Sequence, residues 1–577
     1  MPTSKTPLFD AALDAYYQNK QPGTFTCKET GEAFEITPKE FELYKLLRVP
    51  LPSVTSRARL RRLRASIAGL DLFRRTLPDG TSVVSMFDPE SPIPLFHAED
   101  EWDETKIQPL DYGRVIDPAR SFFEQWSEFS RSVPRPAIAH NPSNERSEWS
   151  VYSHDSKDCY FTYGDSYNER MIYVDQSAKS TDCVDVFMSM SCSWSYDCIQ
   201  CSNSSNLAFC DKCDGCMDTF FCSSCNGCTN CFGCTNLRQK KYCFLNEQLT
   251  EEEYKTRVGA IDLRDARMVE EWKKRIQGIW ESAWHAAGIN PGSEDVEGDN
   301  LHGCHDMTGV YAYECERVLN GYAYGWSKDC ADGTSMIYSE RCYNSVYQLH
   351  GSENKIVNNC QHCIDVEYST LLASCEHCFG CIGLHHKTFC VFNKQYTEEE
   401  YWPLVDAIKT EMLKRGEYGE FFPYSASPCA YNTSHSDPFF PLTKEEAQRL
   451  GARWYDFAQE RALSASPIEE LPLHLNDVTD DVLQKAFKCP QTSRVWRFVK
   501  PELAFHRTMG IALPRIHPTA RRKERIQQNF PIYLFPRTCG RCGKAVKTRI
   551  PPTSPIPLAC EECYTNIVGN DEVLIIK

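Results

Sequence analysis

Four cysteines near the C-terminus have the spacing of a metal site. Cys539 and Cys542 are separated by two residues, and after 17 further residues Cys560 and Cys563 repeat that spacing. Two such pairs at this separation are typical of a zinc ribbon, in which four thiolates close a tetrahedral structural site. Gly543 favours the tight turn that such a pair needs. We expect one zinc ion, held by these four residues, in a module at residues 485–577.

The N-terminal segment resembles this module but lacks its ligands. Cys27-Lys-Glu-Thr30 matches Cys489-Pro-Gln-Thr492, and the offset of 462 residues is kept at further positions. The residues that stand where the four ligands would be are Leu77, Asp79 or Gly80, His97 and Asp100. Residues 1–125 are therefore predicted to be a degenerate zinc-ribbon copy without zinc.

The cysteines in the middle of the chain follow a period of three. All 14 cysteines from Cys159 to Cys243 have residue numbers divisible by three, as do nine of the ten from Cys304 to Cys390. The exception is Cys304. A helix repeats every 3.6 residues and a strand every two, so neither element explains the pattern. It fits a narrow β-solenoid of about 12 residues per rung, with four small inward side chains in each.

This frame predicts a side for each residue. Positions from Cys183 through Val186, Ser189 and Cys192 to Cys234 should be buried, and so should those from Cys330 to Cys381. The neighbouring carboxylates should be exposed, because an unpaired buried charge is costly; they are Asp182, Asp185, Asp197, Asp211 and Asp214. The thiols themselves could pack, form disulfides, bind zinc or hold an iron–sulfur cluster. Against the cluster, no Cys-Pro closes the run from Cys222 to Cys234.

A second duplication defines the middle of the chain. Phe232-Gly-Cys234 recurs as Phe379-Gly-Cys381, 147 residues later, and each copy leads into a Thr-x-x-Glu capping box. We therefore predict a mixed, multidomain fold with two duplicated β-solenoids, each followed by a capping helix. The first solenoid spans 126–249 with cap and linker at 250–300. The second spans 301–396 with cap and linker at 397–484. The N- and C-terminal modules flank them.

The charge is unevenly distributed. The 577 residues carry a net charge of −16, yet Lys485 to Ile550 holds 16 Lys and Arg against two acids. These basic residues could neutralise nucleic-acid phosphates or dock on the acidic remainder of the chain. The candidate contacts to RNA or DNA are Arg521, Arg522, Lys523, Arg525, Arg541, Lys544, Lys547 and Arg549. A second basic cluster comprises Arg57, Arg59, Arg61, Arg62 and Arg64.

Other patterns narrow the function. The sequence has no P-loop, no GxGxxG after a strand, no HExxH and no GxSxG, so we expect a non-enzymatic zinc protein that binds or scaffolds a partner. With no run of 18 apolar residues and no signal-peptide pattern, a cytoplasmic location without membrane contact is expected. An alternative to nucleic acid is a protein partner on the solenoid face. The off-frame tyrosines that could line this face are Tyr160, Tyr163, Tyr167, Tyr322, Tyr324, Tyr343 and Tyr347. A redox or iron–sulfur role is a further alternative.

Several motifs resemble an uncharacterised cysteine-rich zinc-ribbon family found in candidate-phyla-radiation bacteria. They run in order from Phe379 to Leu384, from Phe392 to Tyr401, from Gly419 to Pro423 and from Phe440 to Ala447, and they end with the module from Cys489 to Tyr564. The resemblance implies architecture only. Where relatives carry another CxxC, this chain has His517 and Ala520, so no second zinc site is implied in that module.

Overall fold

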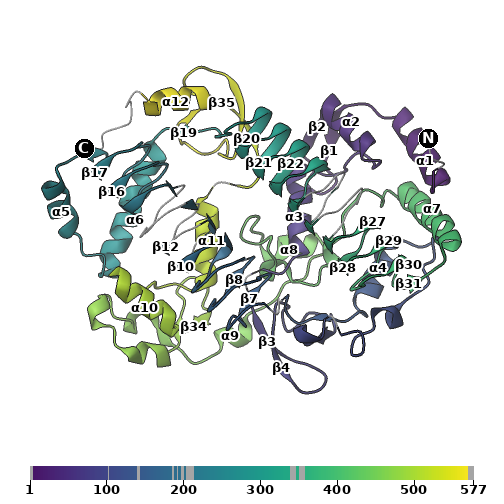
Figure 1. Ribbon diagram of the computed structural model, residues 1–577, viewed down its shortest axis with the longest axis horizontal. Helices are drawn as coiled ribbons and strands as arrows, with labels where there is room; N and C mark the ends of the chain where they lie inside the picture. The colour runs from purple at the N-terminus through teal and green to yellow at the C-terminus, as the bar shows by residue number, and fades with distance from the viewer. Residues whose placement is uncertain are drawn as a thin grey trace.

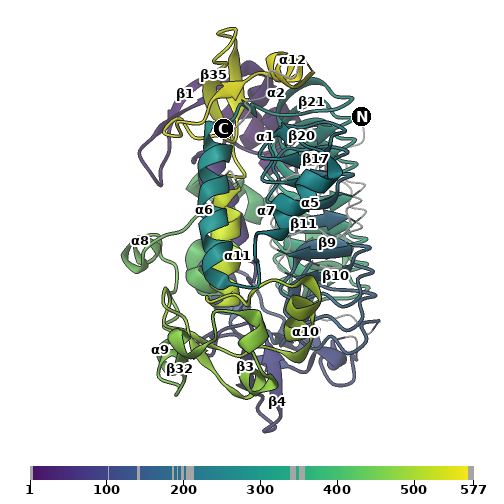
Figure 2. The same cartoon turned by 90° about the vertical axis from the view of Figure 1, so that its left-hand side faces the viewer.

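The structure is a computed structural model with a mixed α/β fold (Figure 1). It describes residues 4–69, 71–101, 103–139, 143–164, 166–184, 187–190, 193–196, 201–202, 213–337, 343, 346–349, 358–529 and 531–569. Small parallel sheets form two ladders, here called the first ladder (residues 143–248) and the second ladder (residues 294–395). Figure 2 shows the ladder strands stacked along one side of the molecule, with α6 (Ala266–Ser282) and α11 (Pro518–Gln528) along the other.

In the first ladder, neighbouring strands pair in parallel and are one rung apart in the chain. Ser150 lies opposite Thr162, Cys201 opposite Cys213, and Cys231 opposite Cys243, so the spacing between partners is constant. The ladder strands are β7 (Ser150–Val151), β8 (Thr162–Tyr163), β9 (Asp175–Ala178), β10 (Thr181–Val184), β11 (Phe187–Met190), β12 (Ser193–Tyr196), β13 (Cys201–Ser202), β14 (Cys213–Asp214), β15 (Met217–Phe220), β16 (Thr229–Phe232) and β17 (Lys241–Phe244), and β18 (Glu247–Gln248) closes the end antiparallel.

At the start of the second ladder, paired residues are closer together in the sequence than in the first ladder. Glu294 lies opposite His305, and the spacing between partners lengthens by one residue at a bulge between Met307 and Gly309. This shift explains why Cys304 lies outside the frame of three, because the rung that separates it from Cys315 is the shorter one. The strands are β20 (Glu294–His302), β21 (His305–Tyr313), β22 (Glu316–Gly325), β23 (Lys328–Ala331), β24 (Thr334–Ile337), β25 (Val346–Leu349), β26 (Asn358–Gln361), β27 (Ile364–Glu367), β28 (Thr370–Ala373), β29 (Glu376–Phe379), β30 (Thr388–Val391) and β31 (Lys394–Gln395).

Between Cys183 and Cys234, and between Cys330 and Cys381, the residues at numbers divisible by three are predicted to point inward. All of them whose side chains the structure describes are buried. They are Cys216, Thr219, Cys222, Cys225, Cys228, Cys231, Cys234, Cys330, Gly333, Cys363, Val366, Ser369, Leu372, Cys375, Cys378 and Cys381. Asp182 is half-exposed and pairs with Arg170. The side chains of Cys183, Val186, Ser189, Cys192, Asp185, Asp197, Asp211 and Asp214 lie outside the described residues. For the described inward positions the burial prediction is confirmed.

The backbone of the ladders has its own period of three. The residue just before each inward position adopts a positive φ, as at Asp218 (49°), Ser224 (53°) and Asn230 (53°). This left-handed region is tolerated best by glycine, asparagine and aspartate, and glycine takes the same place at 215, 227 and 233. Outside the longer strands β20, β21 and β22, one left-handed residue in every three turns the chain at short intervals, so the straight stretches stay only a few residues long.

Helices follow both ladders, as predicted. Thr250 begins α5 (Glu251–Gly259) and Thr397 begins α7 (Glu398–Arg415), and both capping boxes are formed. The predicted cap at 250–300 consists of two helices, because α5 ends at Gly259 and the chain becomes helical again at α6. Trp272 of α6 packs edge-on against the stacked rings of Phe232 and Phe244, so this helix covers the end of the first ladder.

The N-terminal module docks on the second ladder and on α7. Its elements are α1 (Pro7–Gln18), β1 (Gly23–Thr26), β2 (Ala33–Ile36), α2 (Pro38–Leu46), α3 (Ser56–Ala65), β3 (Phe73–Thr76), β4 (Ser82–Ser85), β5 (Leu95–Phe96), α4 (Phe122–Ser130) and β6 (Arg135–Pro136). Asp406 of α7 accepts hydrogen bonds from the first N–H groups of α1. Arg59 of α3 forms a buried bidentate pair with Asp332 of the second ladder.

The C-terminal module docks on both ladders. It contains β33 (Phe487–Lys488), β34 (Val495–Trp496), α10 (Lys500–Met509), α11, β35 (Phe535–Thr538), β36 (Ala545–Thr548), β37 (Leu558–Ala559) and α12 (Glu561–Gly569), and is reached through α8 (Lys444–Arg449), α9 (Ala458–Arg461) and β32 (Ser466–Pro467). Tyr173 of the first ladder donates to buried Glu502 at 3.3 Å. Among the described residues, no helix is long and apolar enough to cross a bilayer.

Candidate metal centre

The first two cysteines of the C-terminal motif lie in the turn of the β35–β36 hairpin. Thr538 pairs with Ala545, and the stretch between them forms the turn. The Cys539 N–H donates to the Lys544 carbonyl at 2.9 Å, and the Gly543 N–H donates back to Cys539 at 3.0 Å. Gly543 has a φ of +76°, a conformation that side-chain-bearing residues rarely adopt. The turn therefore directs the Cys539 and Cys542 thiols to the same side.

The second pair is held by a strand and the start of a helix. Cys560 follows β37 and accepts, through its carbonyl, the first helical N–H bond of α12 from Tyr564 at 2.8 Å. Cys563 lies three residues later, and residues three apart share one face of a helix. The short helix therefore brings Cys560 and Cys563 together without any long-range contact.

The four sulfur atoms converge. All four lie within 4.8 Å of one another, and the Cys542 and Cys560 sulfur atoms are 3.7 Å apart. Four thiolates at about 2.3 Å from a tetrahedral ion would have their sulfur atoms about 3.8 Å apart. Within the part of the chain that the structure describes, this is the one group of metal-ligating side chains so arranged. The cluster could hold a metal ion, as predicted.

The surroundings favour a thiolate at Cys539. Burial opposes its ionisation, but N–H groups donate to its sulfur, from Arg541 at 3.4 Å and Cys560 at 3.2 Å, and hold its pKa at about 6. Hydrogen bonding to the Cys560 thiol raises the pKa of Cys563 to about 12. Four thiolates this close repel one another, so a cation is needed before all four can ionise together.

The walls of the centre come from other parts of the chain. β37 pairs in parallel with β19 (His285–Ala286), the short strand between α6 and the second ladder. Trp284 lies against Gly540, and the Arg541 guanidinium is 5.9 Å from the Trp284 ring. Tyr564 donates to Asn236 of the first ladder at 2.7 Å. The centre thus lies where the first ladder, its cap and the entry to the second ladder meet.

The N-terminal module repeats the turn without the thiols. The Leu77 N–H donates to Thr81, and the Gly80 N–H donates back to Leu77, in the β3–β4 hairpin. Leu77 is buried, and the exposed Asp79 accepts from the Thr81 N–H. His97 accepts a hydrogen bond from the Glu99 N–H through its Nδ1 atom. The contacts of Leu77, Asp79 and Gly80 are those of a hairpin turn, and the contact of His97 is that of a residue at the start of a helix.

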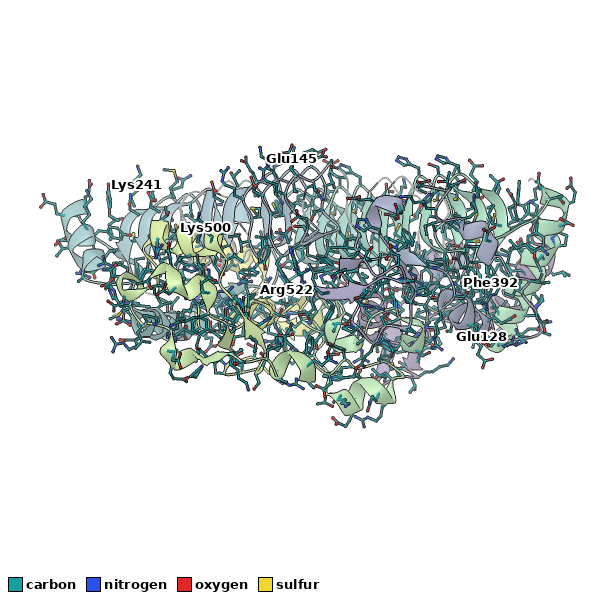
Figure 3. All side chains as sticks on the ribbon, turned by 90° about the horizontal axis from the view of Figure 1, so that it is seen from below. Glu128, Glu145, Lys241, Phe392, Lys500 and Arg522 are labelled. Atoms are coloured by element: carbon teal, nitrogen blue, oxygen red, sulfur yellow. The ribbon has the colours of Figure 1, made fainter. Side chains whose placement is uncertain are left out.

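The predicted nucleic-acid residues divide into two groups. Arg521, Arg522, Arg525 and Arg549 are buried, and Lys523 is half-buried against Asp437. Arg521 pairs with Glu502, and Arg549 pairs with Asp299 of the second ladder and donates to Tyr311. Figure 3 places Arg522 inside the molecule, whereas Glu145 and Lys241 lie on its outer edge. These buried arginines contact other parts of the same chain. This agrees with the alternative in which the basic residues dock on the rest of the chain and do not bind nucleic acid. Arg541, Lys544 and Lys547 are exposed.

The N-terminal basic cluster behaves similarly. Arg59 and Arg64 are buried, and Arg61 and Arg62 both pair with Glu29. Of the off-frame tyrosines, Tyr163, Tyr322 and Tyr343 are buried, Tyr160 is half-buried and Tyr167 is exposed. The side chains of Tyr324 and Tyr347 lie outside the described residues. The buried tyrosines contact arginines, as Arg522 lies 5.8 Å from the ring of Tyr163.

Sequence reasoning missed the supporting residues of the metal centre. Trp284, Asn236 and Tyr564 carry no local signal, because each acts through a partner distant in the chain. The parallel β19–β37 pairing is very short and could not be predicted from periodicity. No protein-family model matches this chain, and a comparison with curated proteins found no match.

Proposed function

We propose that this chain is a zinc-stabilised scaffold protein whose C-terminal zinc ribbon holds its parts together. The observation that carries the proposal is the convergence of four sulfur atoms within 4.8 Å. Four sulfur ligands this close together suit zinc, and a site closed by four protein ligands has no open position for substrate. The ion therefore stabilises the fold, and no catalytic role is proposed for it.

The position of the centre supports the scaffold role. Its second cysteine pair is attached to β37, which pairs with β19 between the two ladders. The Asn290 N–H donates to Glu561 at 3.2 Å, and Lys547 pairs with Glu297 of β20 at 2.6 Å. Zinc binding would order the hairpin and α12 together, and so fix the start of the second ladder relative to the cap of the first. Zinc binding in small ribbon peptides releases about 10–16 kcal/mol, enough to drive such ordering.

We infer that the two ladders are narrow β-solenoids related by duplication. The support is the constant parallel offset between neighbouring strands, the buried frame of three and the left-handed residue before each inward position. The inward thiols pack as small apolar side chains, and all of the described solenoid cysteines are unpaired by disulfides. Each solenoid then offers a long outer face on which a protein partner could bind.

A second candidate function uses the tip of the metal module. Arg541 and Lys544 are exposed beside the exposed ligand Cys542, at the turn of the β35–β36 hairpin. Two cations on a rigid turn could contact the phosphates of RNA or DNA. This contact would be much smaller than the surface predicted from charge, because Arg521, Arg522, Arg525 and Arg549 are buried.

Metal analysis of the purified full chain tests the primary proposal. We expect one zinc per chain, with four sulfur neighbours at about 2.3 Å by X-ray absorption. Replacing Cys539, Cys542, Cys560 and Cys563 with serine should remove the zinc. Cys489→Ser is the matched control, because Cys489 starts a hairpin turn with the same backbone bonds, to Arg494 and from Ser493. Full zinc content in the four-serine variant would refute the assignment.

A further inference from the structure

A small cavity lies where three distant segments meet. It is lined by Arg62 of α3, Trp126 of α4, Arg135 of β6 and Thr370 of the second ladder, together with the segment from Phe422 to Pro428. Its volume has room for about one particle the size of a water molecule. Arg62 and Arg135 are the two charged residues among its lining residues, and both are positive.

Three hydrogen-bond donors of this lining are buried and have no partner among the described residues. They are the Nε atoms of Arg62 and Arg135 and the indole Nε1 atom of Trp126. Arg135 is 4% exposed and Trp126 is 3% exposed. The indole ring is fixed by Phe422, whose centroid is 4.1 Å from its own. Leaving a buried donor unsatisfied is destabilising, and more so when the group is charged.

The surrounding ion pairs leave one positive charge unbalanced. Arg61 and Arg62 share Glu29, and Arg62 also pairs with Glu420 at 3.0 Å. Arg135 donates to the Ser130 hydroxyl at 2.6 Å, and no carboxylate pairs with it in the described part of the chain. The three guanidinium groups of this region, those of Arg61, Arg62 and Arg135, are accompanied by the two carboxylates of Glu29 and Glu420. This leaves a net charge of +1.

The titration behaviour of Arg135 agrees with this count. Burial lowers the pKa of its guanidinium to about 10, and the nearby Cys429 and Tyr152 raise it only in part. Burial also raises the pKa of the Cys429 thiol to about 12, so this thiol is neutral and does not balance the arginine. A buried cation without a counter-ion is strongly destabilising.

We propose that this cavity is a binding site for a monovalent, monoatomic anion of the halide class, chloride under ordinary conditions. One such ion would accept bonds from all three donors and cancel the excess charge. A water molecule accepts fewer bonds, leaves Arg135 unbalanced and brings two donors of its own. A polyatomic anion such as phosphate exceeds the size of the cavity.

The site joins parts of the chain that no local structure connects. Arg62 and Trp126 come from the N-terminal region, Thr370 from the second ladder, and Phe422 from the segment after α7. A bound anion therefore stabilises the docking of the N-terminal module on the second ladder. This role is independent of the zinc centre, which lies in the C-terminal module.

Two measurements on the full chain test the site. Crystals soaked in sodium bromide should show one anomalous peak in this cavity. The unfolding temperature should rise as chloride replaces gluconate at constant ionic strength, because a ligand that binds only the folded state stabilises it. Arg135→Met should abolish this rise, and at the lowest chloride concentration it should unfold at a temperature no lower than the parent chain.

Two further variants make the result decisive. Trp126→Phe keeps the aromatic packing but removes one donor, and should need about tenfold more chloride for half of the effect, as the loss of about 1.4 kcal/mol would give. Arg120→Met removes an exposed arginine that pairs with Glu128, and should leave the chloride dependence unchanged. The proposal is overturned if bromide gives no peak in the cavity, or if chloride and gluconate give the same unfolding temperature in the parent chain.

Discussion

Two adjacent residues of the first ladder should respond in opposite ways to the same substitution. Thr219 is an inward residue with 0% exposure and lies opposite Cys231. Asp218 precedes it and is half-exposed. Thr219→Arg should prevent the ladder from folding, whereas Asp218→Arg should be tolerated. Both variants introduce the same side chain, at neighbouring positions.

The expected free energies follow from the two environments. An arginine at 219 would place a charge among buried thiols, at an effective cost of several kcal/mol, and would overpack the interior by about 1–3 kcal/mol. The total is at least about 4 kcal/mol. At 218 the side chain reaches solvent, and the main cost is a larger residue at a φ of 49°, about 1 kcal/mol. The difference of about 3 kcal/mol exceeds a hundredfold in the folding equilibrium.

Soluble yield and thermal unfolding of the full chain measure this difference. We expect Asp218→Arg to keep the parent yield and to lower the unfolding temperature by a few degrees. Thr219→Arg should give little soluble protein, or a protein whose tertiary circular dichroism is lost. Equal behaviour of the two variants, or a Thr219→Arg protein as stable as the parent, would refute the inward frame and with it the proposed solenoids.

Two other predictions concern protons and phosphates. Burial lowers the pKa of His506 to about 3, and burial also lowers the pKa values of His435 and His517 well below their usual range. The unfolded chain binds these protons near pH 6.5 and the folded chain does not, so the free energy of unfolding should fall as the pH drops from 6.5 toward 3. His506→Gln should make this fall less steep by up to about 1.4 kcal/mol per pH unit, measured by urea denaturation. If the metal module binds nucleic acid, an Arg541→Glu, Lys544→Glu double variant should lose the salt-dependent binding of a labelled RNA without losing zinc; unchanged binding would reject that contact.

Local spacing determined the parts of this protein that depend on neighbours in the sequence. The metal cluster could be predicted because Cys539 and Cys542 share one turn and Cys560 and Cys563 share one helical face. The inward frame could be predicted because a period of three leaves one small residue in each short stretch. Both capping boxes at Thr250 and Thr397 are formed for the same reason.

Charge was the property that sequence reasoning interpreted least well. A run of arginines has the same composition whether it faces solvent or a buried carboxylate. Arg59 meets Asp332 across 273 positions, and Arg549 meets Asp299 across 250. The partners of such residues are set by how the modules dock, and no periodicity in the chain records that docking.

The tertiary structure alone decided which modules meet and what lies between them. The N-terminal module packs on the second ladder and on α7 through Asp332 and Asp406. The C-terminal module packs on both ladders, through Asn236 of the first and Asp299 of the second. The second ladder starts with a shorter rung, which shifts Cys304 from the frame. Sequence spacing determines which side of a strand or turn a residue occupies. Contacts between modules depend on shape and burial over the whole chain, and only the folded structure specifies them.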